Sequence, residues 1–333
     1  MRLVTYQHQC DTGLGIFHNG HVYPLQRMDT IFQMSDMVDF LKGGPSLMDI
    51  AKKYDRLIKE GAFEEIAITT DYTLLAPVPR PTSARDAYAF RQHVAAARRN
   101  RGVDMIPEFD QFPVFYFTNH LGITGPGTIT LMPDHFQRLD FELEVAVVIG
   151  QKGRNIRARE ADHYIAGYMI MNDFSARRLQ MEEMKLSLGP AKGKDFATAI
   201  GPYLVTPDEL EDRRRPAKEG HTGTLYDLVM KAYVNGQQVS EGNLADMDWT
   251  FAEIIERISY GTTIYPGEVI GSGTVGTGCF MELNGTWRRE NPNHQEWWLQ
   301  PGDEVVLEVE RLGVLSNRVI QEDTDHSLLS LKK

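Results

Sequence analysis

Two glutamates separated by one residue, Glu142 and Glu144, lie at the start of a strongly apolar run in this 333-residue chain. Side chains alternate between the two faces of a β-strand, so these two and Asp140 are expected to point the same way. Val145 and Val147 would then point into packing on the other face. Two adjacent buried carboxylates repel, and each costs roughly several kcal/mol of desolvation when it is unpaired. A hard divalent cation would balance their charge, although the same pattern is also common on a solvated strand face.

A third carboxylate, Asp173, ends the strand-like run IAGYMIMND. Its distance from Glu142 along the chain suits two neighbouring strands of one sheet, which would bring the acids together, but Asp173 could also be the N-cap of a helix. A helix is predicted over residues 174–186, and on it Arg177 and Gln180 share a face. These two could clamp a carboxylate of a substrate or belong to a solvated helix face.

A fourth carboxylate, Asp86, lies seven residues before His93 in a segment whose pattern predicts a helix over residues 84–101. Positions i and i+7 lie nearly on one face of a helix, so both side chains can border one cavity. Tyr88 offers a hydroxyl in the same region. A single histidine on a helix is more often a surface or core residue than a catalytic one, so the spacing alone leaves both interpretations open. Gly102 is well placed to end the helix.

Three further residues could take part in chemistry. Lys194, which follows a glycine, could neutralise an oxyanion or could be an exposed loop lysine. The glycine-rich run at 271–278 allows the backbone to approach another group closely, and Thr274 within it could offer a hydroxyl. No Gly-Lys-Ser/Thr follows, so this is not a phosphate-binding loop. Glu282, in a strand-like run at 279–283, could orient a histidine base or face solvent.

The composition limits the possible partners of the chain. A net charge of −11 argues against a nucleic-acid backbone or an anionic membrane as the partner. An anionic substrate would therefore need a local cation or arginines. The two cysteines, Cys10 and Cys279, provide neither a disulfide framework nor a zinc-binding spacing. The sequence has no apolar run long enough to span a membrane and no apolar leader, which predicts a cytoplasmic protein.

The predicted elements suggest two domains and a mostly β fold. Strands at 2–7 and 14–25 and helices at 34–42 and 46–60 precede Pro77, Pro79 and Pro81, which no regular element can accommodate together. This places a small N-terminal domain at residues 1–75 and a catalytic body at 76–333. In the body, strands are predicted at 111–118, 142–149, 165–172, 201–205, 228–234, 268–272, 279–283 and 304–310, with helices at 159–165, 174–186 and 249–259. Hairpin turns dominate, so an α+β body rich in β-strands and partly closed on itself is expected, and not a doubly wound sheet.

The segments DFELE, MNDFSARRLQ, GKDFAT and YPGEVIGSGTVGTG together resemble the fumarylacetoacetate hydrolase superfamily, over residues 72–320. The resemblance implies a mixed β-roll catalytic domain, a small N-terminal α/β domain and a homodimer. It also implies a divalent ion, Mg²⁺ or Ca²⁺ with Mn²⁺ also acceptable, and a small anionic diketo-acid substrate. The implied metal ligands are Asp86, Glu142, Glu144 and Asp173.

The same resemblance implies roles for the other residues. His93 would be the base, oriented by Glu282, while Lys194 and Arg177 would stabilise an oxyanion and Thr198 would line the metal site. The implied substrate contacts are Tyr88, Tyr116, Gln180 and Thr274. Two positions depart from the pattern, because Met184 replaces an expected tyrosine and Gly102, next to Arg101, replaces an expected arginine.

The activity implied is hydrolysis of a C–C bond in a β-diketone acid of the fumarylacetoacetate or acylpyruvate type, by attack of a water that His93 activates. The alternative is a hydratase, isomerase or oxaloacetate decarboxylase that uses the same metal site. A third hypothesis is a non-catalytic β-rich binding protein in which the acid cluster holds a structural ion.

Overall fold

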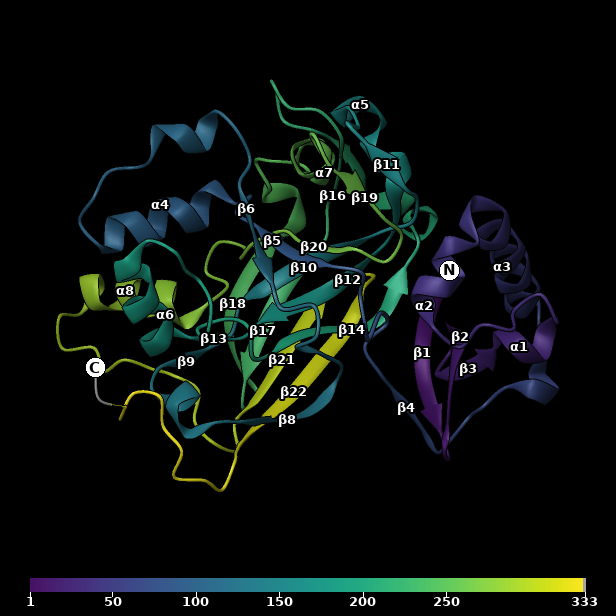
Figure 1. The fold of residues 1–333 in the computed structure, drawn as a ribbon, viewed down its shortest axis with the longest axis horizontal. Coiled ribbons are helices and arrows are strands. Elements are labelled where there is room, and N and C mark those ends of the chain that lie inside the picture. The colour runs from purple at the N-terminus through teal and green to yellow at the C-terminus, as the bar shows by residue number, and fades with distance from the viewer. Residues whose placement is uncertain (332–333) are drawn as a thin grey trace.

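The structure, a computed structural model, describes residues 1–331 (Figure 1). Its helices are α1 (Leu25–Met28), α2 (Met37–Lys42), α3 (Gly44–Lys59), α4 (Arg91–Asn100), α5 (Ala158–Ala161), α6 (Arg177–Glu183), α7 (Phe251–Ser259) and α8 (Phe280–Glu290). An eleven-stranded mixed sheet and a five-stranded sheet form the body. The fold is therefore of the α+β class, as the sequence predicted.

The larger sheet contains β1 (Arg2–His8), β2 (Asp11–His18), β3 (His21–Pro24), β4 (Tyr72–Leu74), β5 (Ala84–Ala87), β6 (Phe115–Thr118), β7 (Ile123–Thr124), β10 (Leu143–Ile149), β12 (Ile165–Asp173), β14 (Thr198–Val205) and β20 (Val269–Gly271). The smaller sheet contains β8 (Gly127–Leu131), β17 (Val229–Val234), β18 (Gln237–Asn243), β21 (Glu304–Val309) and β22 (Gly313–Gln321). Three short pairs complete the strands: β9 (Leu139–Asp140) with β13 (Ser175–Ala176), β11 (Gly153–Arg154) with β19 (Thr263–Ile264), and β15 (Arg214–Pro216) with β16 (Thr224–Tyr226).

The central strand β10 has two buried faces. Val145 and Val147 pack into the core between the two sheets, together with residues of β17, β21 and β22, as their alternation in the sequence predicts. Ala146 and Val148 point the other way, into a second core that α2 and α3 cover. Glu144 has the same parity as Ala146, so it lies on this second face at the end of the strand where the apolar packing stops.

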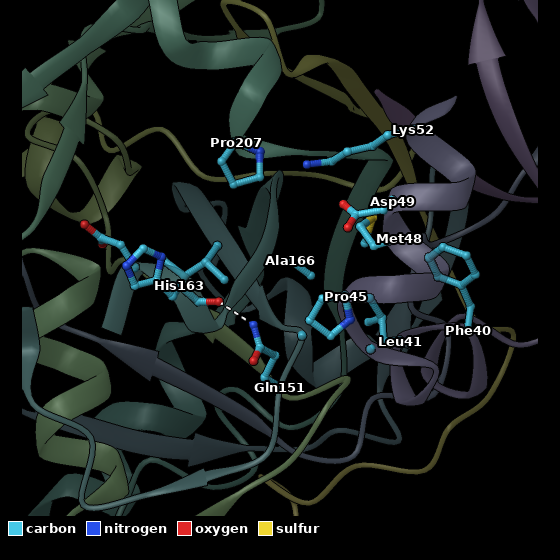
Figure 2. A pocket seen from close by; sticks show the side chains of 14 residues that line it. Phe40, Leu41, Pro45, Met48, Asp49, Lys52, Gln151, His163, Ala166 and Pro207 are labelled. Carbon is cyan, nitrogen blue, oxygen red and sulfur yellow. Dashed lines mark hydrogen bonds between the residues drawn. The ribbon is translucent and has the colours of Figure 1, made fainter. Parts of the chain in front are cut away.

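The N-terminal segment gathers at one side of the molecule (Figure 1). It shares the large sheet with the body, because β1 pairs with β14 through Arg2↔Val205 and Leu3↔Leu204. A cavity of about 290 Å³ lies where α2 and α3 meet the body, and Figure 2 shows Lys52 and Phe40 on one side of it and His163 on the other. No helix or strand spans residues 75–83, where the prolines lie. A domain boundary near residue 76 stays a prediction.

Two predicted elements are wrong, and both errors concern the site. Residues 84–101 are not one helix, because Ala84–Ala87 is a strand between β20 and β6 and the helix begins only at Arg91. Residues 279–283 are not a strand but the first turn of α8. The carboxylate of Asp140 accepts hydrogen bonds from the N–H groups of Phe280 (2.7 Å) and Met281 (3.0 Å), so a distant residue caps this helix.

Among the described residues, none of the helices has both the length and the apolarity needed to cross a bilayer.

Candidate active site

Three buried carboxylates meet at one end of the large sheet. Asp86 comes from β5 and Glu144 from β10, while Glu142 lies in the two-residue connection between β9 and β10. One oxygen of each lies within 4.8 Å of one oxygen of each of the others, and the three residues are 3%, 0% and 5% exposed. The structure therefore brings together three of the four predicted metal ligands. Asp86 joins them from a strand and not from the helical face that the sequence suggested.

Glycines of the segment after β20 allow this close approach. The N–H of Gly273, whose φ is +78°, donates to Asp86 Oδ1 (3.0 Å) and to Glu144 Oε2 (3.1 Å). A Cβ added at Gly271 would lie 2.4 Å from Asp86 Oδ1, so only glycine leaves room for the carboxylate there. The hydroxyl of Thr274 lies 3.4 Å from Glu144 Oε1. The groups that the glycine-rich run approaches are therefore the carboxylates themselves.

Asp173, the fourth predicted ligand, is joined to this cluster through Lys194. The Lys194 ammonium donates to Asp173 Oδ2 (2.7 Å) and also to Glu142 Oε2. The hydroxyls of Tyr116 and Thr198 donate to the same aspartate. Burial alone would lower the pKa of Lys194, but Asp173 and Glu142 raise it above its usual value, so the lysine is a buried cation and not an exposed loop residue.

Arg177 is also buried, and each of its three guanidinium nitrogens binds a protein group. It pairs with Asp140 Oδ2 (2.8 Å) and Glu142 Oε1 (2.7 Å), and its Nη1 donates to Gln180 Oε1 (3.0 Å). Arg177 therefore holds two carboxylates of the protein itself, and Gln180, its predicted partner in a substrate clamp, binds Arg177 and not a carboxylate. Asp140, which the sequence placed only on a strand face, is the residue that links Arg177 to the start of α8.

His93 and Glu282 form a buried pair beside the carboxylates. Nδ1 of His93 lies 2.6 Å from Glu282 Oε2, and the other carboxylate oxygen of Glu282 accepts the N–H of Thr277 (3.0 Å). Figure 1 shows their helices, α4 and α8, side by side, and Asn100 Nδ2 on α4 donates to the carbonyl of Glu282 (3.0 Å). Tyr88 stacks edge-on against His93, with ring centroids 5.9 Å apart.

The electrostatics of the cluster fit a divalent cation. Burial, together with Asp173, raises the pKa of Asp86 to about 7, and burial with Asp86 and Glu142 raises the pKa of Glu144 well above its usual range. Glu142 behaves oppositely, because Lys194 and Arg177 outweigh its burial and lower its pKa to about 2.

Bound protons or a cation must balance the charges of these groups. Five buried carboxylates (Asp86, Asp140, Glu142, Glu144 and Asp173) would, if all were ionised, face only two buried cations and leave three negative charges without a counter-charge, and the raised pKa values of Asp86 and Glu144 express this excess. An ion with two positive charges would remove most of this excess. A donor set made only of oxygens suits Mg²⁺, Ca²⁺ or Mn²⁺.

A cavity of about 960 Å³ opens onto the cluster. Nine of the thirteen predicted site residues line it, while Glu144, Asp173, Thr198 and Glu282 are not part of its lining. The nine are Asp86, Tyr88, His93, Tyr116, Glu142, Arg177, Gln180, Lys194 and Thr274. The lining residues Arg138 and Trp298 lie outside the sequence motifs that predicted the site, and Arg101 was marked in the sequence only by its position next to Gly102.

The α+β fold and this cavity define a small-molecule enzyme with a carboxylate-rich centre that could hold a metal ion. Residues 82–320 match the family described as fumarylacetoacetate (FAA) hydrolase C-terminal, and the chain belongs to this family. The resemblance seen in the sequence is thereby confirmed.

Relatives within the family carry different activities in their names. The chain is 30% identical over 325 residues to the human protein named oxaloacetate tautomerase FAHD2A, mitochondrial, covering 96% of this chain and 92% of that protein. It is 27% identical over 253 residues to oxaloacetate tautomerase YisK of Bacillus subtilis, covering 75% and 74%. The solved fumarylacetoacetate hydrolase of Exiguobacterium antarcticum has the same fold, with a TM-score of 0.70, 24% identity and coverage of 97% and 100%.

Proposed function

We propose that this protein interconverts the keto and enol forms of a small 2-oxo acid, with oxaloacetate as the first substrate to test. The observation that carries the proposal is the buried His93–Glu282 pair, whose histidine lies within 4.8 Å of an oxygen of Glu142. A base in this position can move a proton at the carbon next to a carbonyl group. The names of the human and Bacillus subtilis relatives favour this isomerase over the hydrolase that the sequence analysis put first.

A divalent ion held by Asp86, Glu142 and Glu144, with Asp173 beside them, would supply Lewis-acid polarisation of the 2-oxo group. The arrangement of these acids around one end of the sheet supports this assignment. Mg²⁺, Ca²⁺ and Mn²⁺ all fit oxygen donors, and metal analysis of the purified protein would distinguish them.

Four residues of the chain have separate roles in the transfer of this proton. His93 takes a proton from the carbon beside the carbonyl, and Glu282 stabilises the resulting imidazolium through Nδ1. The imidazolium then gives a proton to the carbonyl oxygen, which regenerates neutral His93, so the net change is the shift of one proton from carbon to oxygen. Lys194 stabilises the negative charge that develops on this oxygen. Arg177 pairs with Asp140 and Glu142, so in this proposal it holds Glu142 in place instead of contacting the substrate.

The cavity wall provides the remaining contacts. Tyr88 and Tyr116 bring hydroxyls, and burial raises the pKa of Tyr88 to about 12, so that it stays a hydrogen-bond donor at neutral pH. Gln180 and Thr274 also line the cavity and are assigned to substrate positioning. Nε of Arg101 donates to the backbone carbonyl of Ala97 (3.1 Å), and the other N–H groups of its guanidinium are assigned to the distal carboxylate of a dicarboxylic acid.

Hydrolysis of a β-diketone acid is the second candidate, and the size of the cavity favours it. A volume of about 960 Å³ is more than a four-carbon acid needs. Apolar side chains that include Ile106, Val114 and Met181 line it and could receive an acyl group. In this reaction His93 would remove a proton from water, which attacks the carbonyl distant from the carboxylate. The bond between this carbonyl carbon and the carbon that separates the two carbonyl groups would break, and the departing enolate would take up the proton held by His93.

One substrate panel separates these functions. The purified protein, with Mg²⁺ or Mn²⁺, is given enol-oxaloacetate, keto-oxaloacetate, an acylpyruvate and fumarylacetoacetate, each with and without a chelator. Faster loss of the enol absorbance without pyruvate formation supports the tautomerase. Pyruvate from oxaloacetate would indicate decarboxylation, and chelator-sensitive cleavage of a diketone would indicate the hydrolase. A protein that turns over none of them but melts at a lower temperature with chelator would be a binding protein with a structural ion.

The proposal also includes the oligomeric state of the protein and its location in the cell. A homodimer is proposed from the family resemblance, and exposed apolar residues near the cavity, such as Leu186 and Leu188, support it. Light scattering in solution tests the dimer. The cytoplasmic location predicted from the sequence is untested, and the human relative is named as mitochondrial, so cell fractionation should include both compartments.

A further inference from the structure

A thiol lies next to the proposed base, and neither proposed reaction uses it. Sγ of Cys279, a nitrogen of His93 and a carboxylate oxygen of Glu142 all lie within 4.8 Å of one another. All three residues are buried. This group differs from the oxygen cluster of Asp86, Glu142 and Glu144, with which it shares only Glu142. One nitrogen, one sulfur and one oxygen donor form the kind of ligand set that Zn²⁺ takes in proteins, whereas Mg²⁺ and Ca²⁺ avoid sulfur.

Each of the three donors is held in place by contacts of its own. Nδ1 of His93 is bonded to Glu282, so Nε2 is the nitrogen left for an ion. A carboxylate on the other ring nitrogen is the usual outer partner of a metal-binding histidine, because it fixes the orientation of the ring. Arg177 and Lys194 fix the Glu142 carboxylate.

The backbone on both sides of Cys279 is also fixed. The carbonyl of Gly278 accepts the N–H of Leu143 at 2.9 Å. After the cysteine, the N–H groups of Phe280 and Met281 bind Asp140. The interactions that start α8 therefore also hold the Cys279 thiol near His93 and Glu142. Both of these residues line the cavity, so an ion that enters the cavity can reach them.

We propose that His93, Glu142 and Cys279 form a second cation site, selective for a thiophilic divalent ion such as Zn²⁺, and that an ion there inhibits the enzyme. The three side chains would supply three ligands and a water the fourth, with Cys279 binding as the thiolate after releasing its proton. An ion on Nε2 occupies the lone pair that His93 needs as a base. The inhibition, but not the site, rests on the role of His93 in the proposed function.

Cobalt is a suitable probe, because Co²⁺ replaces Zn²⁺ and absorbs strongly in the near ultraviolet when a thiolate is bound. Co²⁺ is titrated into the full-length protein with Mg²⁺ in excess and a reductant that is not a thiol. We expect the cobalt–thiolate band in the wild type and in Cys10→Ser, since Cys10 is exposed and lies outside the cluster. The band should be absent in Cys279→Ser. No band in the wild type, or a band that survives in Cys279→Ser, overturns the site.

Activity then tests the inhibition separately. Cys279→Ser should keep the Mg²⁺-supported rate, while the Zn²⁺ concentration that halves this rate should rise by about tenfold or more, as expected when one ligand is lost. A Cys279-dependent cobalt band without Zn²⁺ inhibition would leave the site in place and overturn the role of His93 as the base. If Cys279→Ser does not fold, X-ray absorption of the zinc-loaded Cys10→Ser variant tests the site instead. A sulfur atom at about 2.3 Å from zinc supports the site, and its absence overturns it.

Discussion

Nδ1 of His93 and Oε2 of Glu282 lie 2.6 Å apart, although 189 residues separate them in the chain. Both side chains are only 4% exposed. Their two helices are tied by a second hydrogen bond, from Asn100 to the Glu282 carbonyl, so the pair is held rigidly. A charged carboxylate on Nδ1 stabilises the imidazolium, which is what a base needs when it has taken up a proton.

Glu282→Gln should therefore lower kcat by about 10²–10⁴-fold, the usual contribution of general acid–base catalysis. The amide keeps the shape of the carboxylate but not its charge, so the Kd for Mg²⁺ or Mn²⁺ should not change. Steady-state kinetics and calorimetric metal titration measure the two quantities. Glu290→Gln, an exposed position at the end of the same helix, is the matched control and should behave as the wild type. An unchanged kcat in Glu282→Gln would remove His93 from the mechanism.

Glu144→Gln should weaken binding of the divalent ion. Loss of an outer-shell partner costs roughly 10–100-fold in metal affinity, and loss of a direct ligand should cost at least as much. Chelation of the wild type should abolish turnover, and added Mg²⁺ or Mn²⁺ should restore it. Glu160→Gln, on the short helix α5 away from the cavity, controls for loss of one charge. Equal metal affinity in Glu144→Gln and the wild type would contradict the assignment of Glu144 as a ligand.

Gly271→Ala should reduce metal affinity through a steric effect alone. Its new methyl group would lie 2.4 Å from Asp86 Oδ1 and 2.9 Å from the Met171 side chain, and overpacking of this kind costs about 1–3 kcal/mol. The carboxylate must move away, which disturbs a ligand without altering its chemistry. Metal titration and thermal unfolding measure the two effects. A variant with wild-type affinity would mean that Asp86 does not hold the ion in the observed position.

Arg101→Met should discriminate between dicarboxylic and monocarboxylic substrates. A charge-assisted hydrogen bond contributes about 1.5–3 kcal/mol, so KM for oxaloacetate should rise by about tenfold or more. The rate with a 2-oxo acid that lacks the distal carboxylate should be little changed. Arg99→Met is the control, because Arg99 lies in the last turn of α4, two residues before the C-cap Arg101, is exposed and does not line the cavity. A similar loss for both substrate types would show that Arg101 acts on the fold and not on selectivity.

The stabilisation that comes from the contact between α3 and the 3₁₀ helix Pro207–Arg213 should decrease at acid pH. Burial alone raises the pKa of Glu209, but hydrogen bonds from Lys59 and from the N-terminal ammonium of Met1 (2.6 Å) together outweigh it and lower the pKa to about 2. Because this pKa lies below the unfolded value of about 4.3, the pair stabilises the protein at neutral pH. That stabilisation is lost as the pH falls toward 2.

Lys59→Gln should therefore lower Tm at pH 7, and its deficit relative to the wild type should vanish near pH 2. The effect should be small, about 0.2–1 kcal/mol, because both side chains are partly exposed and solvent screens them. Lys53→Gln, an exposed lysine of the same helix, is the control. A deficit that persists unchanged at low pH would mean that Lys59 stabilises the protein through packing and not through charge.

The sequence by itself determined the α+β class and singled out the acidic residues Asp86, Glu142 and Glu144 that the fold brings together. Strand periodicity placed Val145 and Val147 in the core and Glu144 on the opposite face, because a period of two is a local property of the chain. The chemical types at Asp86, Glu142, Asp173, Lys194 and the glycine-rich run were enough to recognise the family before any fold was known.

Only the tertiary structure decided how these residues meet. Asp86 lies on a strand because β5 pairs with β20 and β6, and pairing with distant segments overrode a local pattern that favoured a helix. Glu282 lies on a helix because Asp140, distant in the chain, caps it. Arg177 is committed to Asp140 and Glu142, and Cys279 is placed beside His93, through contacts between segments far apart in the sequence. Spacing along the chain carries no information about such contacts, because they depend on packing and not on local geometry.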